Sequence, residues 1–78
     1  MAHVLNQDIS IGENLRTLRR RAGLSQEQVA AQLQIRGINI SREIISQMER
    51  GDHNIRISVL LALRDLYQTD IADFFMGL

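Results

Sequence analysis

Apolar residues recur at helical intervals from the first part of the chain to the last. The first stripe lies on one face of a helix and consists of Ile11, Leu15, Leu18 and Ala22. Ser10 precedes the stripe and Glu13 follows three residues later, which predicts a capping box at the start of this helix. Gly23 predicts its end, because glycine adopts the left-handed conformation that commonly follows a helix.

A second short helix is predicted directly after Gly23. Ser25 and Gln28 have the spacing of another capping box. The buried stripe of this helix is predicted to be Val29, Ala30 and Leu33, with Gly37 as the left-handed stop.

The third predicted helix begins after Ser41, a favourable N-cap residue, and ends at Gly51. Ile45 and Met48 are three residues apart and therefore share its inward face. Two short helices joined by a turn in this way are typical of a helix-turn-helix, in which the second helix lies in the major groove of DNA.

Two more helices are predicted beyond a loop from Asp52 to about Ile57. Ser58 is expected to cap the fourth helix, with the apolar residues Leu60, Leu63, Leu66 and Tyr67. Asp70 is expected to cap a fifth, with Ile71, Phe74 and Phe75. The fold class is therefore all-α, a compact bundle of five short helices that contains a helix-turn-helix. We expect one domain over residues 10–78, after a flexible segment at 1–9.

Composition narrows the possible functions. The 78 residues suffice for one small domain, and the absence of cysteine excludes a disulfide or a thiolate metal site. The longest aliphatic run, Val59 to Leu63, is too short to span a membrane. No nucleophile with a base, no glycine-rich phosphate loop and no metal-ligand cluster is apparent in the sequence. We therefore expect a cytoplasmic protein that is not an enzyme, with no metal, no cofactor and, for want of a second domain, no small-molecule pocket.

The net charge of zero conceals a basic middle between two acidic ends. Between Asn14 and Arg64, nine arginines stand against four acidic residues, which leaves a net charge of +5. All the basic residues are arginine, whose planar guanidinium suits bidentate contacts with phosphate or guanine. An ordinary solvated surface rich in arginine is the alternative that composition alone leaves open.

Two motifs in the correct order resemble the Xre/Cro-type helix-turn-helix family, which includes the lambdoid phage repressors. Residues 23–30, GLSQEQVA, are similar to the opening of its helix pair, and residues 45–51, ISQMERG, are similar to the end of its recognition helix. Residues 60–75 are similar to its fourth and fifth helices. The resemblance implies a transcriptional regulator that binds double-stranded DNA specifically, with the recognition helix at about Ser41–Arg50. It also implies a dimer on a pseudo-palindromic operator.

The turn from Gln34 to Ile40 is longer than in the commonest form of the family. Its apolar residues Ile35, Ile38 and Ile40 are expected to pack beneath the helix pair. Arg36 and Asn39 are offered as DNA phosphate contacts that members with a shorter turn lack.

By position in the resemblance, the base-reading residues are Arg42, Glu43, Ser46 and Gln47. Arg42 can pair with guanine, Gln47 with adenine, and Glu43 with cytosine unless it pairs with Arg42. Ile44 either packs against the long turn or contacts thymine methyl groups.

The resemblance also implies roles outside the base-reading face. Gln26 and Arg50 are expected to contact phosphates, and Gln26 also to brace the recognition helix. Arg19 and Glu49 are expected to form a structural ion pair at the edge of the core.

The C-terminal end is expected to form the dimer contact through Phe74, Phe75 and Met76, because a small domain cannot bury so much apolar surface. At least one of the two phenylalanines is expected to belong to the core. The alternative function is an antitoxin-type module that neutralises a partner toxin and regulates its own operon. Many antitoxins share this fold, and fold alone does not decide between the two functions.

Overall fold

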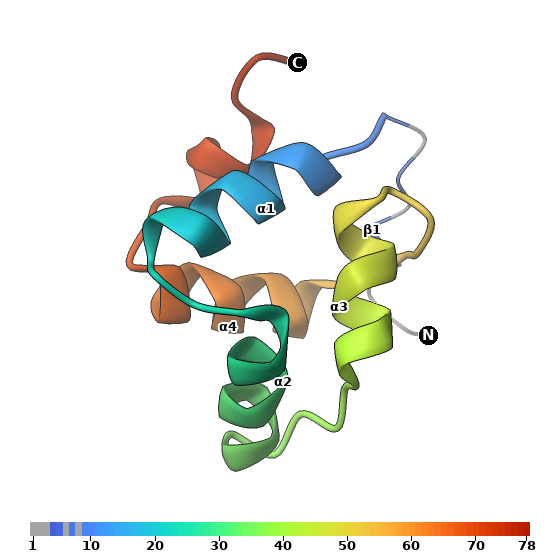
Figure 1. The fold of residues 1–78 in the computed structure, drawn as a ribbon. Helices are drawn as coiled ribbons and strands as arrows, with labels where there is room; N and C mark the ends of the chain where they lie inside the picture. Colours follow the sequence, from blue (N-terminus) through green and yellow to red (C-terminus); the bar gives the residue numbers. More distant parts are fainter. Residues whose placement is uncertain (1–3, 6, 8) are drawn as a thin grey trace.

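A computed structural model describes residues 4–5, 7 and 9–78 of the chain. It is mostly helical, and its elements follow one another with short connections (Figure 1). The α-helices are α1 (Gly12–Arg21), α2 (Gln26–Ile35), α3 (Arg42–Glu49) and α4 (Ile57–Tyr67). The remaining elements are the strands β1 (Val4–Leu5) and β2 (Ile55–Arg56) and the 3-10 helix η1 (Ile71–Phe75).

The core lies where α1, α3, α4 and η1 meet, and α2 packs against α3 and α4 (Figure 1). Every helix contributes apolar side chains to one continuous cluster, as the helical stripes predict. Its buried members are Ile11, Leu15, Leu18, Val29, Ala30, Leu33, Ile45, Met48, Ile55, Val59, Leu60, Leu63, Tyr67 and Phe74.

The predicted ends of the helix pair are confirmed. The Ser25 hydroxyl accepts a hydrogen bond from the Gln28 N–H, and the Gln28 side chain accepts one from the Ser25 N–H. Ser41 caps α3 by accepting from the Ile44 N–H. Gly37 follows α2 and has a φ of 81°, the left-handed conformation that commonly comes after the end of a helix.

Two other predicted caps are wrong. The residue before α1 is Ile11, and the Ser10 hydroxyl accepts from the Gly12 N–H instead of forming a capping box with Glu13. The residue before α4 is Arg56, so Ser58 lies inside the helix. In both cases another segment holds the backbone before the helix. The Ile11 N–H donates to the Gln7 side chain before α1, and β2 pairs with β1 before α4.

The fifth predicted helix is a 3-10 helix and not an α-helix. Five residues are too few to stabilise an α-helix, and the last turn is held from outside. The Asn14 side-chain amide donates to the carbonyl oxygens of Phe74 and Met76. At the other end the Asp73 carboxylate accepts from the Thr69 hydroxyl and from the Asp70 N–H, and these bonds lower its pKa.

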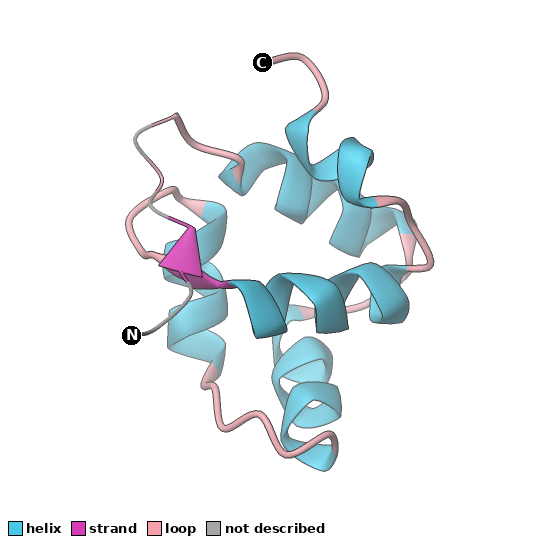
Figure 2. Cartoon of the chain, turned by 180° about the vertical axis from the view of Figure 1, so that it is seen from behind, coloured by secondary structure: helices cyan, strands magenta, loops and turns pink. Residues whose placement is uncertain are grey.

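The short ladder of β1 and β2 was not predicted from the sequence. The strands are antiparallel, with Val4 opposite Arg56 and Leu5 opposite Ile55, and β2 leads directly into α4 (Figure 2). A strand of two residues is too short to show alternation. Residues 1–3, 6 and 8 lie outside the described part, so the predicted flexibility of segment 1–9 stays a prediction.

None of the helices in the described part of the chain is long and apolar enough to cross a membrane.

Candidate nucleic-acid interface

The helix α3 has a buried face and an outer face. Ile45 and Met48 are almost fully buried and fix the helix on the core. The four residues predicted to read bases lie on the other side: Arg42 and Glu43 are exposed, and Ser46 and Gln47 are half-buried. The structure therefore brings these four predicted residues together on one side of α3.

Arg42 and Glu43 are neighbours at the first turn of this face. Their charged atoms are 3.7 Å apart, and the side chains are 49% and 69% exposed. An exposed pair of this kind contributes only about 0–1 kcal/mol, so either side chain can leave it at little cost. Both are therefore available for a ligand placed against the helix.

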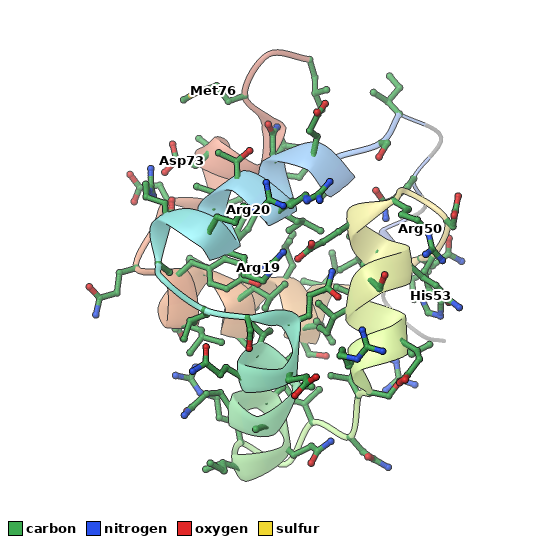
Figure 3. All side chains as sticks on the ribbon, viewed as in Figure 1. Arg19, Arg20, Arg50, His53, Asp73 and Met76 are labelled. Atoms are coloured by element: carbon green, nitrogen blue, oxygen red, sulfur yellow. The ribbon has the colours of Figure 1, made fainter. Side chains whose placement is uncertain are left out.

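A buried ion pair holds α3 against α1. The Arg19 Nε donates to Glu49 Oε2 at 2.6 Å, and an Arg19 terminal nitrogen donates to Glu49 Oε1 at 3.0 Å. The second terminal nitrogen donates to the Leu24 carbonyl at 2.8 Å. The two side chains are 10% and 5% exposed, which is a deeper position than the predicted edge of the core. Figure 3 shows Arg19 pointing from α1 into the interior toward α3.

The electrostatics of this site follow from its burial. The hydrogen bonds with Glu49 raise the pKa of the Arg19 guanidinium and outweigh the opposing effect of burial. Burial also raises the pKa of the nearby Tyr67 phenol, and the Glu49 charge adds to the effect. The pair thus stays charged in a poorly hydrated place, where each partner depends on the other.

Gln26 joins α2 to the same carboxylate. Its side-chain amide donates to Glu49 Oε1 at 3.1 Å, so one oxygen accepts from both Arg19 and Gln26. Gln26 also lines a shallow polar groove with Arg16, Arg19, Ser25, Glu27 and Arg42. The start of α2 and the basic side chains of α1 and α3 therefore border one concave surface.

The other predicted phosphate contacts are spread over the molecule. Arg36 donates to the Ala62 carbonyl of α4 at 3.4 Å, so its side chain reaches toward α4. Arg50 pairs with Asp52 at 3.3 Å in an exposed position. Figure 3 shows Arg50 and His53 on the side of α3 that faces away from α2.

The long turn packs only in part as predicted. Ile38 and Ile40 are half-buried against the core, but Ile35 is 78% exposed, so the prediction is wrong for Ile35. Ile35 is the last residue of α2, and that helix buries Val29, Ala30 and Leu33 on its inner face. Ile44 is half-buried and borders the same groove as Ile38 and Ile40, which favours packing against the turn.

Sequence reasoning missed the part that Gln7 plays at the end of α3. Its side-chain amide donates to the Met48 carbonyl at 3.3 Å and to the His53 carbonyl at 2.7 Å. Its side-chain oxygen accepts from the Ile11 N–H at 3.1 Å. A single polar residue in contact with a segment about forty positions away leaves no periodic signal in a sequence.

The dimer prediction needs one correction. Phe74 is fully buried in the core, so it cannot take part in a contact between two molecules. Phe75 is 38% exposed, Met76 67% and Leu78 65%. Figure 3 shows Met76 at the far end of the molecule from the long turn.

Comparisons with known proteins agree with this geometry. A family described as a helix-turn-helix domain matches residues 10–74. Among solved structures, the chain is similar to the restriction-modification controller protein C.AhdI from Aeromonas hydrophila, with 29% sequence identity and a TM-score of 0.71. The similarity covers 83% of this chain and 87% of that chain. No curated protein matches the chain.

The chain belongs to the helix-turn-helix family, as the Xre/Cro-type motifs indicate. Proteins of this class bind DNA and regulate transcription, and both properties hold for this chain.

Proposed function

We propose that this protein regulates transcription by binding a specific sequence of double-stranded DNA, with α3 in the major groove. The observation that carries the proposal is the outer face of α3, where Arg42, Glu43, Ser46 and Gln47 lie beside one another above a buried ion pair. The buried pair fixes the helix, whereas the exposed Arg42–Glu43 pair is the one ion pair or hydrogen bond that the four outer side chains make with described residues. A rigid helix with uncommitted polar side chains is what direct readout of base edges requires.

Phosphate contacts are proposed on both sides of α3. Gln26 and the N-terminus of α2 border the polar groove. Asn39 lies in the long turn before α3, and Arg50 directly follows α3. Free N–H groups at the start of a helix attract phosphate oxygens. Arg36 would have to leave its hydrogen bond with the Ala62 carbonyl in order to contact DNA.

Binding to random-sequence duplex pools tests the function directly. We expect the enrichment of one pseudo-palindromic sequence, with half-sites about 34–36 Å apart. Two subunits that each neutralise about four phosphates give a slope near −7 when log affinity is plotted against log salt. No binding of the folded protein to any duplex at about 50 mM salt would overturn the proposed function.

We also propose that two copies meet through the C-terminal residues Phe75, Met76 and Leu78. These apolar side chains lie within the last four residues of the sequence and are exposed. The Asn14 amide fixes the backbone on which they stand, through the carbonyls of Phe74 and Met76. A fixed apolar surface loses little conformational entropy when it is covered by a partner.

The variant Met76→Glu should dissociate the dimer, because it places a charge in the apolar contact. We expect a monomer in analytical ultracentrifugation and a loss of at least about tenfold in affinity for the full operator, since binding the two half-sites is then no longer linked. Leu61→Glu is the matched control, because Leu61 is an exposed apolar residue of α4 outside the proposed contact. If the unmodified protein is itself monomeric when bound to DNA, the apolar end serves another partner, as expected for an antitoxin.

A further inference from the structure

A groove runs along one flank of α3, on the side of the long turn. Its apolar surface is formed by Ile38 and Ile40 of the turn, Ile44 and Met48 of α3, and Val59 of α4. Its volume is about 210 Å³. The long turn supplies one wall, so the groove depends on the segment in which this chain departs from the commonest form of its family.

The rim of the groove is polar and carries positive charge. It consists of Asn39, His53, Asn54 and Arg56, and no acidic residue of the described part of the chain lines the groove. The His53 ring nitrogen Nδ1 is 2.6 Å from the Asn54 carbonyl oxygen, which fixes the ring. The side chains of Asn39, Asn54 and Arg56 make no hydrogen bond or ion pair with any described residue.

This combination of an apolar floor and a basic rim distinguishes the groove from other basic parts of the surface. Arg42, Arg50 and Arg64 pair with carboxylates, and Arg20, although without an ion pair among the described residues, does not line this groove. Arg56 combines a backbone fixed within the β1–β2 ladder, a guanidinium without a partner among the described residues, and a place beside the apolar floor. Uncommitted donors that surround an apolar floor are typical of a small-molecule site, in which the apolar part supplies affinity and the polar groups supply orientation.

We propose that this groove binds a small amphipathic carboxylate. Its aliphatic or aromatic part lies on Ile38, Ile44 and Val59, and its carboxylate accepts from Arg56 and the amides of Asn39 and Asn54. The volume is below the roughly 300–1,000 Å³ of sites for larger ligands, which limits the ligand to about ten non-hydrogen atoms. At ordinary ligand efficiencies such a molecule binds with a Kd of about 0.1–1 mM.

A bound carboxylate should lower the affinity for DNA. The groove contains Ile44, which neighbours the base-reading residue Glu43, and Asn39, a proposed phosphate contact. The ligand would occupy the Asn39 donor and place a negative charge next to the DNA backbone. This effect rests on the proposed function, whereas binding of the carboxylate does not. Coupling of ordinary size reduces DNA affinity by about fivefold or more, and DNA reduces carboxylate affinity by the same factor.

The test uses two acids, 4-methylpentanoate and 3-phenylpropionate, with their primary amides as uncharged counterparts. Each is titrated into the full chain, and the backbone amide signals are followed by NMR. We expect saturable shifts confined to residues of the groove, and at least about fivefold tighter binding of the acids than of the amides. Arg56→Gln should abolish this preference for the acid. Arg64→Gln is the matched control, because Arg64 lies on α4, outside the groove, and pairs with Asp65.

Three results would overturn the proposal. The first is the absence of saturable shifts up to about 10 mM acid. The second is equal binding of acid and amide by the unmodified chain. The third is equal acid binding by the unmodified chain and the Arg56→Gln variant. If Arg56→Gln also loses DNA affinity uniformly in the first or the third case, the polar rim is assigned to the DNA backbone. The DNA-binding proposal survives each of these results, so the two can fail separately.

Discussion

Replacing Arg19 with methionine is expected to lower the free energy of unfolding by about 3 kcal/mol, close to the roughly 3–5 kcal/mol that accompanies loss of one partner from a buried ion pair. The Glu49 side chain is only 5% exposed, and among the described residues it keeps a single side-chain donor in the variant, the amide of Gln26. A carboxylate in that position has lost both its counter-ion and most of its hydration. Glu49→Gln should cost less, about 2 kcal/mol, because the glutamine oxygen still accepts a hydrogen bond from the Arg19 guanidinium.

Thermal and denaturant unfolding measure this effect. For a domain of this size, about 3 kcal/mol corresponds to a decrease in Tm of about 12–24 °C. Arg20→Met is the matched control, because Arg20 is adjacent on α1, exposed, and without an ion pair among the described residues. A double-mutant cycle should give a coupling energy above about 0.5 kcal/mol between positions 19 and 49. Equal losses in the Arg19 and Arg20 variants, or additive effects in the cycle, would contradict the structural role.

The sequence correctly predicted the features of the helix pair that depend on local periodicity. The helix pair, its caps at Ser25 and Ser41 and its stop at Gly37 each arise from interactions within a few residues. The outer position of Arg42 and Gln47 follows in the same way from the burial of Ile45 and Met48. Motif and periodicity agreed here, and both describe short-range structure.

Long-range contacts were the part that could not be predicted. Gly12 is an example, because a Cβ at this position would overlap the carbonyl oxygen of Glu49. The absence of a side chain lets α1 approach the end of α3 closely, and this approach accompanies the deep burial of the Arg19–Glu49 pair. The sequence showed a glycine inside a helix but not which backbone lies opposite it.

The same limit applies to the candidate site and to the groove. Ile38 and Ile40 were expected to pack beneath the helix pair, and packing against the turn was one of two alternatives for Ile44. The cavity that remains between these residues depends on β2 and the start of α4. The β1–β2 ladder that fixes Arg56 has only two residues in each strand. Structure of this kind is set by packing between segments and has no signature of its own in the sequence.

Replacing base-reading residues is expected to change which DNA sequence is bound, and not only how tightly. Arg42→Ala and Gln47→Ala should each lose about 1–3 kcal/mol of discrimination at one base position of every half-site, the value of a good bidentate contact. On a symmetric operator with two half-sites, the loss applies twice. The combined variant should therefore approach the affinity of nonspecific binding, which lies about 4–10 kcal/mol below specific binding.

Selection from random duplexes, with relative affinities measured for each single base change, separates these effects. Gln26→Ala is the matched control, because we assign Gln26 a phosphate contact and a hydrogen bond to Glu49, and its loss should weaken all sequences about equally. Glu49→Gln should likewise leave the preferred sequence unchanged, since the Glu49 side chain faces Arg19 and not the outer side of α3. If Arg42→Ala lowers the affinity for all duplexes by one common factor, then Arg42 contacts a phosphate. In that case the base-reading face would begin at Glu43.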